Sequence, residues 1–359
     1  MIRGYELARP LGRGAAGVVY LGRRIDDGTT VALKHVSNGN ADTRAVSRLR
    51  REAAALRDID HPGVVRFVEV VDDGDDLWLA MEHVPGAPLG ALRPLTLPAA
   101  LCAVAQIATA LDAVHRHGIV HRDVKPSNVI VDPHGRCRLV DFGIARFLAD
   151  SQHARLGDGL RTDTGTVLGT PRYLAPEQLE AAPPGSACDI YGLAVVAYEL
   201  AVGRVPFDDD DMLALLDAHR HRSPPDPAAL NPALAGPMAA ALVAGLAKEP
   251  DARPSTAAVW WQSIADAAFA KAIDWRARGT DELAAAVADH LARATGHDLD
   301  DTSFGAGETE TRTEHVEARL ALPRTRLPVF RGRRRRRVML GTLAFVIASI
   351  AGYVLVRVL

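Results

Sequence analysis

The stretch Leu11–Tyr20 constrains the fold of this chain more than any other, because it carries the glycine pattern Gly-x-Gly-x-x-Gly. In a dinucleotide-binding fold a helix begins after the third glycine, but Val18-Val19-Tyr20-Leu21 is β-branched and aromatic, which favours a strand. Asp26-Asp27-Gly28 is a turn signal, and Val31-Ala32-Leu33-Lys34 resumes strand character. The glycines are therefore expected at the tip of a hairpin, where backbone amides can approach phosphate oxygens; a flexible turn without a ligand is the alternative.

The next segments predict a small antiparallel sheet with one helix. Apolar residues recur at helical spacing from about Arg44 to Asp58, and two strand-like runs follow, Val64 to Val71 and Leu77 to Met81. Lys34 ends an apolar strand and needs a carboxylate partner if it does more than reach solvent. Glu52 lies beside the apolar face of the helix and can supply that carboxylate, with an exposed salt bridge along the helix as the alternative.

The octapeptide His121–Asn128 places an acid, two cations and an amide directly after an apolar stretch. Pro126 removes a backbone donor and Ser127-Asn128 favour turns, so the segment predicts a loop. Loops that present polar groups carry function more often than scaffold, although an exposed charged turn remains the alternative. The preceding segment, Leu101 to His117, predicts a long buried helix.

Composition excludes several classes of protein. With 48% hydrophobic and 24% charged residues among 359, the chain is ordinary for a folded protein and not globally disordered. A formal net charge of −2 provides no field for holding nucleic acid, so no nucleic-acid partner is expected. Cys102, Cys137 and Cys188 lack Cys-x-x-Cys spacing, which predicts reduced thiols and neither a disulfide framework nor a zinc site.

Six motifs between about residues 5 and 265 together resemble the eukaryotic-type (Hanks-type) protein kinases, and among them the bacterial membrane-anchored serine/threonine protein kinases. They are the glycine loop, Val-Ala-Leu-Lys ending at Lys34, Glu52, His121-Arg122-Asp123 with Asn128, Asp141-Phe142-Gly143, and Ala175-Pro176-Glu177. Lys125, two residues after Asp123, resembles the serine/threonine branch. The resemblance implies an α+β fold of two lobes, with a small antiparallel sheet and one helix in the N-lobe and a larger helical C-lobe.

The resemblance also implies a role for each residue in phosphoryl transfer from ATP to Ser/Thr hydroxyls of protein substrates. Asp123 is expected to accept or orient the hydroxyl proton and Lys125 to neutralise the γ-phosphate. Lys34, fixed by Glu52, is expected to hold the α- and β-phosphates. Asn128 and Asp141 are the expected Mg²⁺ ligands, with Mn²⁺ as an alternative ion. The expected nucleotide-binding residues are Lys34, the glycine-loop residues Leu11, Gly12, Arg13, Gly14, Ala15, Ala16, Gly17, Val18 and Val19, and the hinge residues Glu82 and Val84.

Three functions fit these motifs. The first is an active serine/threonine kinase that also autophosphorylates, and the second is a pseudokinase scaffold that binds nucleotide and partner proteins at a membrane. The third is a tail-anchored docking module whose kinase activity is incidental. The first is favoured because scaffolds usually lack one or more of the catalytic residues, and here all of them are present: Lys34, Glu52, Asp123, Lys125, Asn128 and Asp141.

The stretch from about Ala149 to Val167 is too polar for a core and resembles the activation segment of these kinases. Its candidate phosphorylation sites are Thr162, Thr164 and Thr166, and Arg122 is the expected partner of such a phosphate; plain solvated threonines are the alternative. In the same lobe the resemblance implies that Asp189 braces the catalytic loop. It also implies that Glu177 and Arg253 form a buried ion pair.

The end of the chain predicts a membrane anchor. Thr280 to Ala294 predicts an amphipathic helix capped by Thr280, and a polar, mobile linker is expected after it. Val338–Val356 is uncharged and, as a helix, roughly 28 Å long, which matches the hydrocarbon core of a bilayer. The arginines just before it, Arg331 and Arg333–Arg337, place the kinase domain in the cytoplasm by the positive-inside rule.

The expected organisation is therefore a single-pass protein of the cell membrane. Its parts are a catalytic domain over 1–268, with lobes of about 1–83 and 84–268, a juxtamembrane helix and linker over 269–337, a transmembrane helix over 338–356 and a short extracytoplasmic tail over 357–359. Ala344, Ala348 and Gly352 form a small-residue stripe at four-residue spacing. Homodimerisation through this stripe in the lipid bilayer is a further hypothesis.

Overall fold

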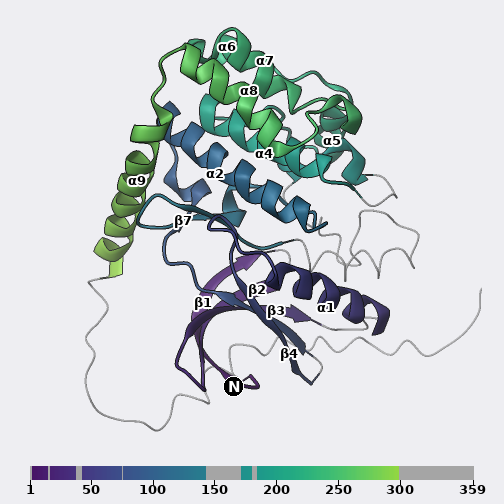
Figure 1. The fold of residues 1–359 in the computed structure, drawn as a ribbon, viewed down its shortest axis with the longest axis vertical. Coiled ribbons are helices and arrows are strands. Elements are labelled where there is room, and N and C mark those ends of the chain that lie inside the picture. Colours follow the sequence, from purple (N-terminus) through teal and green to yellow (C-terminus); the bar gives the residue numbers. More distant parts are fainter. Residues whose placement is uncertain are drawn as a thin grey trace, which may run out of the picture. The chain divides into compact units, whose positions relative to one another are not determined.

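A sheet-built N-lobe and a helical C-lobe make up the part of the chain that this computed structural model describes (Figure 1). That part comprises residues 2–14, 17–37, 43–74, 76–142, 171–179 and 184–298, all within one compact unit. The two-lobed α+β architecture expected from the sequence is confirmed. Several expected features lie outside the described residues: Ala15, Ala16, Gly143, Thr162, Thr164, Thr166, the linker and the span Val338–Val356.

The N-lobe is an antiparallel sheet whose strands lie in the order β1-β2-β3-β5-β4. One helix, α1 (Thr43–Arg57), packs on it through the buried side chains of Leu49, Ala53 and Leu56. The strand bounds are Tyr5–Gly14 (β1), Gly17–Arg24 (β2), Thr30–Ser37 (β3), Phe67–Asp73 (β4) and Asp76–Glu82 (β5).

The glycine-rich stretch forms the expected hairpin. Gly14 of β1 pairs with Gly17 of β2, so the two strands are still paired at the last described residues of this stretch. β1 is an edge strand, which is why Pro10 is tolerated although it cannot donate to a ladder, and the register shifts between Pro10 and Gly12. A strand, and not a helix, therefore follows the glycines.

The expected strand from Val64 to Val71 is placed too early. β4 begins at Phe67, whereas Val64 forms an isolated parallel bridge with Leu139 and the N–H of Val65 donates to the Leu139 carbonyl at 3.0 Å. Val64 and Val65 are apolar because they are buried against the small sheet of the C-lobe. Periodicity along the chain cannot distinguish that partner from the N-lobe sheet.

The C-lobe surrounds α2 with further helices, and a three-stranded sheet in the order β6-β7-β8 lies toward the N-lobe (Figure 1). The strands are Ala87–Pro88 (β6), Val129–Val131 (β7) and Cys137–Leu139 (β8). The helices are Leu97–Arg116 (α2), Ala187–Val202 (α4), Met212–His221 (α5), Pro227–Leu230 (α6), Pro237–Ala244 (α7), Ala257–Ala270 (α8) and Trp275–Asp298 (α9). Short 3-10 turns are Leu89–Leu92, Pro126–Asn128, Pro171–Tyr173, Pro176–Leu179, Pro232–Leu234 and Pro250–Ala252.

The long helix α2 begins four residues before the expected start at Leu101. Thr96 is its N-cap, with a side chain that accepts from the Ala99 N–H, and Pro98 in the first turn needs no intrahelical bond. Among the described residues, α2 is the one helix long and apolar enough to cross a membrane. Because 72% of its apolar window is buried inside the lobe, it is a core helix.

The expected helix from Thr280 to Ala294 is longer at both ends. α9 begins at Trp275, where the Asp274 carboxylate accepts from the Ala277 N–H at 3.1 Å, so Thr280 lies inside the helix and is not its N-cap. Leu283 and Val287 are fully buried, as their spacing predicts. Gly279 lies within this helix and does not interrupt it. At that position α9 approaches α2 too closely to leave room for a side chain.

Candidate active site

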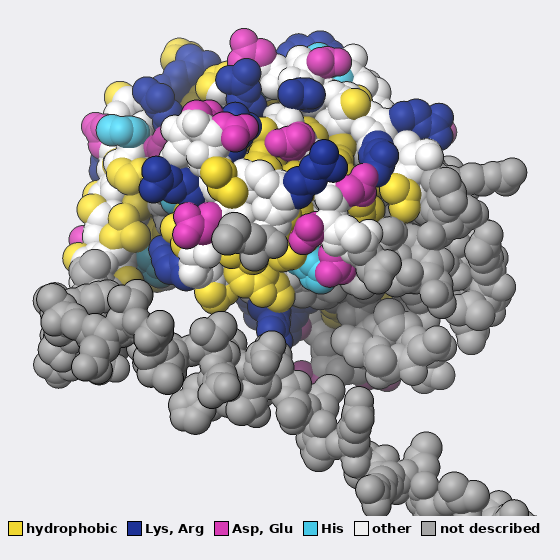
Figure 2. Space-filling view, turned by 90° about the horizontal axis from the view of Figure 1, so that it is seen from below, with side chains coloured by type: hydrophobic (Ala, Val, Ile, Leu, Met, Phe, Trp, Pro, Cys, Tyr) yellow, Lys and Arg dark blue, Asp and Glu magenta, His cyan; other side chains and the backbone are white. Residues whose placement is uncertain are grey.

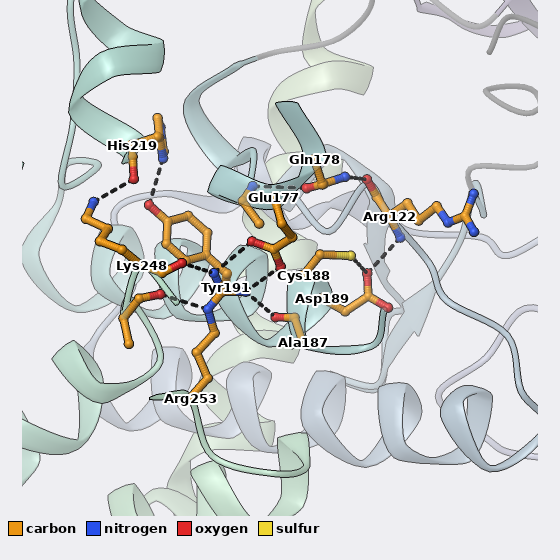
Figure 3. A network of polar contacts seen from close by, with 12 residues as sticks. Arg122, Glu177, Gln178, Ala187, Cys188, Asp189, Tyr191, His219, Lys248 and Arg253 are labelled. Atoms are coloured by element: carbon orange, nitrogen blue, oxygen red, sulfur yellow. Dashed lines mark hydrogen bonds and ion pairs between the residues drawn. The ribbon is translucent and has the colours of Figure 1, made fainter. Parts of the chain in front are cut away.

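The backbone of the loop 121–128 is held from below by one buried carboxylate, as the resemblance implied (Figure 3). Asp189, at the start of α4, accepts from the His121 N–H at 2.8 Å and from the Arg122 N–H at 2.7 Å. His115 Nε2 lies 2.8 Å from the same carboxylate. Burial raises the pKa of Asp189, but the interactions with His115 and His121 together outweigh it and keep the pKa below its ordinary value.

His121 joins this loop to the segment around Asp141. Its imidazole is fully buried, with Nδ1 accepting from the Asp123 N–H at 3.3 Å and Nε2 lying 3.0 Å from the Val140 carbonyl. These partners assign the proton to Nε2, because a carbonyl can only accept. The ring also packs on Phe142 with centroids 4.8 Å apart. The loop and the Asp141-Phe142 segment are therefore one connected unit.

Two residues of this unit adopt a backbone conformation that side chains rarely take. Arg122 has φ 65° and Asp141 has φ 61°, both in the left-handed region. Such residues cost on the order of 1–3 kcal/mol each and persist only where surrounding contacts impose them. Here the contacts are Asp189 under Arg122 and the His121 imidazole bonded to Val140, next to Asp141.

The polar side chains of the loop converge on Asp123. Lys125 Nζ lies 2.7 Å from Asp123 Oδ2, and Asn128 Nδ2 donates to the same oxygen at 2.9 Å and to the Asp123 carbonyl at 2.8 Å. The three expected residues are thus brought together in one hydrogen-bonded set. Because both amide protons of Asn128 are used, its Oδ1 is the atom left to face a cation.

Lys34, from the N-lobe, reaches Asp141 in the segment after β8. Its side chain is 4% exposed and forms an ion pair with Asp141. Glu52 lies half-buried on α1, next to the buried Ala53, as its position beside the apolar face predicted. The Lys34–Asp141 pair was not among the expected contacts, and the expected pairing of Lys34 with Glu52 stays a prediction.

An apolar cavity lies directly behind the Lys34–Asp141 pair. It is lined by both of these residues together with Leu56, Val65, Phe67, Leu79, Met81 and Phe142. Met81 precedes the expected hinge, where β5 ends at Glu82 and where Val84 packs, half-buried, against the main core. The N–H of Glu82 donates to the Arg66 carbonyl at 2.8 Å, so this N–H is occupied by the sheet.

The chemistry of the donor set fits a divalent ion held with nucleotide phosphates. Carboxylate and amide oxygens of Asp141 and Asn128 are the hard ligands such ions prefer. The described residues contain no group of three or more His, Cys, Asp or Glu side chains placed to bind a metal, so phosphate and water oxygens would complete the coordination. The hairpin fits phosphate as well, because a Cβ at Gly12 would meet no atom within 4 Å and its backbone stands open.

Beside the loop, the segment 171–179 is anchored by the expected buried ion pair (Figure 3). Arg253, 5% exposed, donates to both carboxylate oxygens of Glu177 at 2.6 and 2.8 Å and stacks on the ring of Tyr191. Gln178 Nε2 donates to the Arg122 carbonyl at 2.8 Å. Sequence reasoning missed Gln178, which links this segment to the catalytic loop.

A second buried carboxylate was also missed. Glu199, on α4, accepts from Tyr173 Oη at 2.7 Å and pairs with Arg93. Burial and this carboxylate raise the pKa of Tyr173. The available signal was a glutamate inside an apolar helix, which demands a partner. The contact of His115, near the end of α2, with Asp189 was likewise missed.

Comparison with known proteins defines the class. A family model described as the protein kinase domain matches residues 5–263. The chain therefore belongs to the protein kinase domain family.

Individual relatives are bacterial. The chain is 34% identical over 324 residues to the serine/threonine-protein kinase Pkn1 of Myxococcus xanthus, covering 88% of this chain and 46% of Pkn1. It is 40% identical over 270 residues to PkaA, a serine/threonine-protein kinase of Streptomyces coelicolor, covering 70% and 48%. A crystal structure of the Mycobacterium tuberculosis PknI kinase domain is similar with a TM-score of 0.58 and 27% identity, covering 75% of this chain and 97% of that one. The chain thus matches about half the length of these two curated relatives.

Proposed function

We propose that this protein is a serine/threonine protein kinase that transfers the γ-phosphoryl group of ATP to hydroxyls of protein substrates. The proposal rests on one observation: the hydrogen-bonded set of Asp123, Lys125 and Asn128 is joined to the segment of the Lys34–Asp141 pair, because the Val140 N–H donates to the Asn128 carbonyl at 2.9 Å. Protein kinases use these residue types to position ATP, a divalent ion and a hydroxyl. The similarity to relatives named serine/threonine-protein kinases supports the substrate class.

Within this proposal, the bond from the γ-phosphorus to the bridging oxygen breaks and a new bond to the Ser/Thr oxygen forms. Asp123 orients that hydroxyl and accepts its proton, and ADP leaves with the bridging oxygen. Lys125 neutralises the transferring group, a role that its distance of 2.7 Å from Asp123 supports. Groups of this kind typically stabilise a transition state by about 3–4 kcal/mol each.

On the nucleotide side, Lys34 neutralises the α- and β-phosphates, and the hairpin around Gly12 and Gly17 covers them with backbone amides. The Glu82 carbonyl and the Val84 backbone face the adenine. Asn128 and Asp141 would hold Mg²⁺, with Mn²⁺ as an alternative, and the ion would supply neutralisation of the phosphate oxygens. The proposal includes activation by phosphate on Thr162, Thr164 or Thr166, which would pair with Arg122.

The test incubates the full chain in detergent with MgATP and a generic protein acceptor, and counts phosphothreonine and phosphoserine by mass spectrometry. Asp123→Asn should reduce phosphate incorporation on the order of 10³-fold, while Asp73→Asn, an exposed N-lobe substitution, should leave it unchanged. Incorporation that survives in Asp123→Asn would contradict the role of Asp123. Nucleotide binding without any transfer by the wild type would instead favour the pseudokinase scaffold.

We further propose that Val338–Val356 anchors the kinase in the cell membrane with the catalytic unit in the cytoplasm, which the uncharged span and the preceding arginines support. The substitutions Ala344→Arg and Ala348→Arg would each cost about 2.5–3.5 kcal/mol of insertion free energy. The double variant should therefore be extracted from membranes by alkaline carbonate, whereas the wild type should stay. Extraction of the wild type and the double variant to the same extent would refute the membrane anchor.

Pairing of two anchors through Ala344, Ala348 and Gly352 completes the proposal, because small residues allow helices to approach closely. Cross-linking in membranes should fall in Ala348→Leu and persist in Val346→Leu, a bulk change off the stripe. Equal cross-linking in the two variants would count against the homodimer.

A further inference from the structure

The helix α9 belongs to the packed C-lobe, although the sequence places it beyond the catalytic domain. It runs along the side of the lobe against α2 and also contacts β6 and β7 (Figure 1). Leu283 and Val287 are fully buried in this interface. Thr96, the N-cap of α2, hydrogen-bonds to Glu282 of α9. The residue that caps the start of α2 is thus itself bonded to α9.

The first turns of α9 are in backbone contact with α2. A Cβ at Gly279 would lie 2.4 Å from the Cys102 Cβ and 2.6 Å from the Pro98 carbonyl oxygen. Thr280 Oγ1 lies 3.4 Å from Cys102 Sγ. Interiors packed this closely do not absorb an added methyl group without moving an element. Position 279 therefore sets the distance between the two helices.

The same turn of α9 rests on the turn between β7 and β8. Gly135 has φ +73°, and a Cβ there would lie 2.1 Å from the Thr280 carbonyl oxygen. This turn is internally stiff, because the Asp132 carboxylate accepts from the His134 N–H at 2.8 Å and from the Arg136 N–H at 3.0 Å. A shift of α9 is therefore passed to the turn as a whole.

Gln106 of α2 completes the attachment of the β7–β8 hairpin. Its Nε2 donates to the Gly135 carbonyl at 3.1 Å and its Oε1 accepts from the Cys137 N–H at 2.9 Å. The turn is held between an α2 side chain on one side and the α9 backbone on the other. Because α2 and α9 also contact each other, each of the three elements, the β7–β8 hairpin, α2 and α9, contacts the other two.

The opposite end of this hairpin carries the two metal-ligand candidates. Asn128 directly precedes β7, Asp141 follows β8 after one residue, and the Val140 N–H donates to the Asn128 carbonyl at 2.9 Å. At about 3.3 Å per residue, these positions lie roughly 13 Å from the turn. A stiff hairpin of that length transmits displacements of its turn to both ligands, and such sites tolerate errors of only about 0.5 Å.

We infer that α9 is a positioning element of the active site: its seat on Cys102 and on the turn at Gly135 aligns Asn128 and Asp141 for a divalent cation. The identity of that ligand rests on the proposed function. Displacement of α9 weakens cation binding without touching any residue that contacts substrate. A force on the C-terminal part of the chain can thereby change the geometry of the site through α9.

The experiment uses the full chain in detergent and the variant Gly279→Ala, which adds a wedge between α9 and α2 while favouring helix. Ala288→Leu, on the exposed face of the same helix, is the matched control. In Gly279→Ala we expect the Mg²⁺ concentration for half-maximal phosphate transfer to rise at least fivefold. Amide hydrogen exchange of residues 128–141 should accelerate at least tenfold, and both quantities should match the wild type in Ala288→Leu.

Unchanged exchange at 128–141 and an unchanged Mg²⁺ midpoint, with only a lower maximal rate, would overturn this inference and leave α9 a purely stabilising helix. If Gly279→Ala does not fold, Leu283→Val loosens the same interface by one methylene and should move both quantities in the same direction by a smaller factor. A wild type without transferase activity refutes the proposed function. The exchange measurement then still decides the role of α9.

Discussion

The two sides of the active site are built by different means. On the C-lobe side, the loop 121–128 is held by buried polar side chains, with Asp189 and His121 bonded directly to its backbone. On the N-lobe side, β1 is mostly exposed and β2 is mostly half-buried, and the hairpin that they form is held by a strand ladder with two register shifts. The groups that we propose to meet developing charge are thus preorganised, while the proposed cover over the nucleotide is left able to adjust.

A second comparison is between the exposed and the buried charged side chains. On the face drawn in Figure 2, basic and acidic side chains are interspersed and no single sign dominates. Exposed ion pairs of this kind, such as Arg172–Asp208, contribute about 0–1 kcal/mol, because water screens them. The polar contacts that organise the molecule are therefore the buried ones around Asp189, Glu199 and Arg253.

The largest expected effect breaks the braced side. Asp189→Ala removes the acceptor of two loop amides and the partner of His115, so we expect the free energy of unfolding to fall by about 3–5 kcal/mol and activity to be lost. Urea unfolding measures the first quantity. Asp217→Ala, which removes an exposed aspartate beside His221, is the control and should change stability by less than about 0.5 kcal/mol. A loss below 1 kcal/mol in Asp189→Ala would refute the brace.

The second prediction concerns Gly17, a position of the hairpin without room for a side chain. Gly17 has φ +121°, and a Cβ there would lie 2.4 Å from the His35 carbonyl oxygen. Strain and overlap together should lower the free energy of unfolding of Gly17→Ala by about 3 kcal/mol. Thermal unfolding of the variant checks this. A melting temperature equal to that of the wild type would show that the hairpin is compliant even at Gly17.

The third prediction concerns the pH dependence of stability that a buried histidine of the C-lobe causes. Burial, with the nearby Lys248 charge, lowers the pKa of His219 from 6.5 to about 4. The unfolded chain therefore takes up this proton first, and the free energy of unfolding falls as pH drops from about 6.5 to about 4. Between pH 7 and 5 this group alone should cost about 2 kcal/mol.

His219→Asn removes the titrating group while keeping a polar partner for the Tyr191 hydroxyl, 2.8 Å away. Urea unfolding at pH 7 and 5 should therefore show a smaller loss of stability in the variant than in the wild type. Identical losses would mean that His219 does not titrate in this range. The buried polar groups of the C-lobe would then give no pH dependence of stability there.

The smallest expected effect on stability is at Gly12. Its φ is not in the left-handed region and an added Cβ meets no atom within 4 Å, so Gly12→Ala should change the free energy of unfolding by less than about 0.5 kcal/mol. The KM for ATP should nevertheless rise, because the methyl group stands where phosphate approaches. Equal KM values for variant and wild type would remove Gly12 from the nucleotide site.

Local patterns were enough to predict much of this fold. The β-branched residues after Gly17 predicted a hairpin, and Leu49, Ala53 and Leu56 predicted the buried face of α1. The errors fall where distant segments meet. Val64 and Val65 were assigned to the wrong sheet, and Thr280 was taken as a cap although α9 begins at Trp275.

The amino-acid order by itself determined which groups this site has: the motifs around Lys34, Asp123 and Asp141, with a glycine hairpin before them. Only the tertiary structure decided how they are held, because each support comes from far along the chain. Asp189 reaches back 68 residues to His121, and Arg253 reaches 76 residues to Glu177. A buried carboxylate or a glycine without room for a Cβ is defined by its neighbours in space. Those neighbours follow from packing, which no local pattern records.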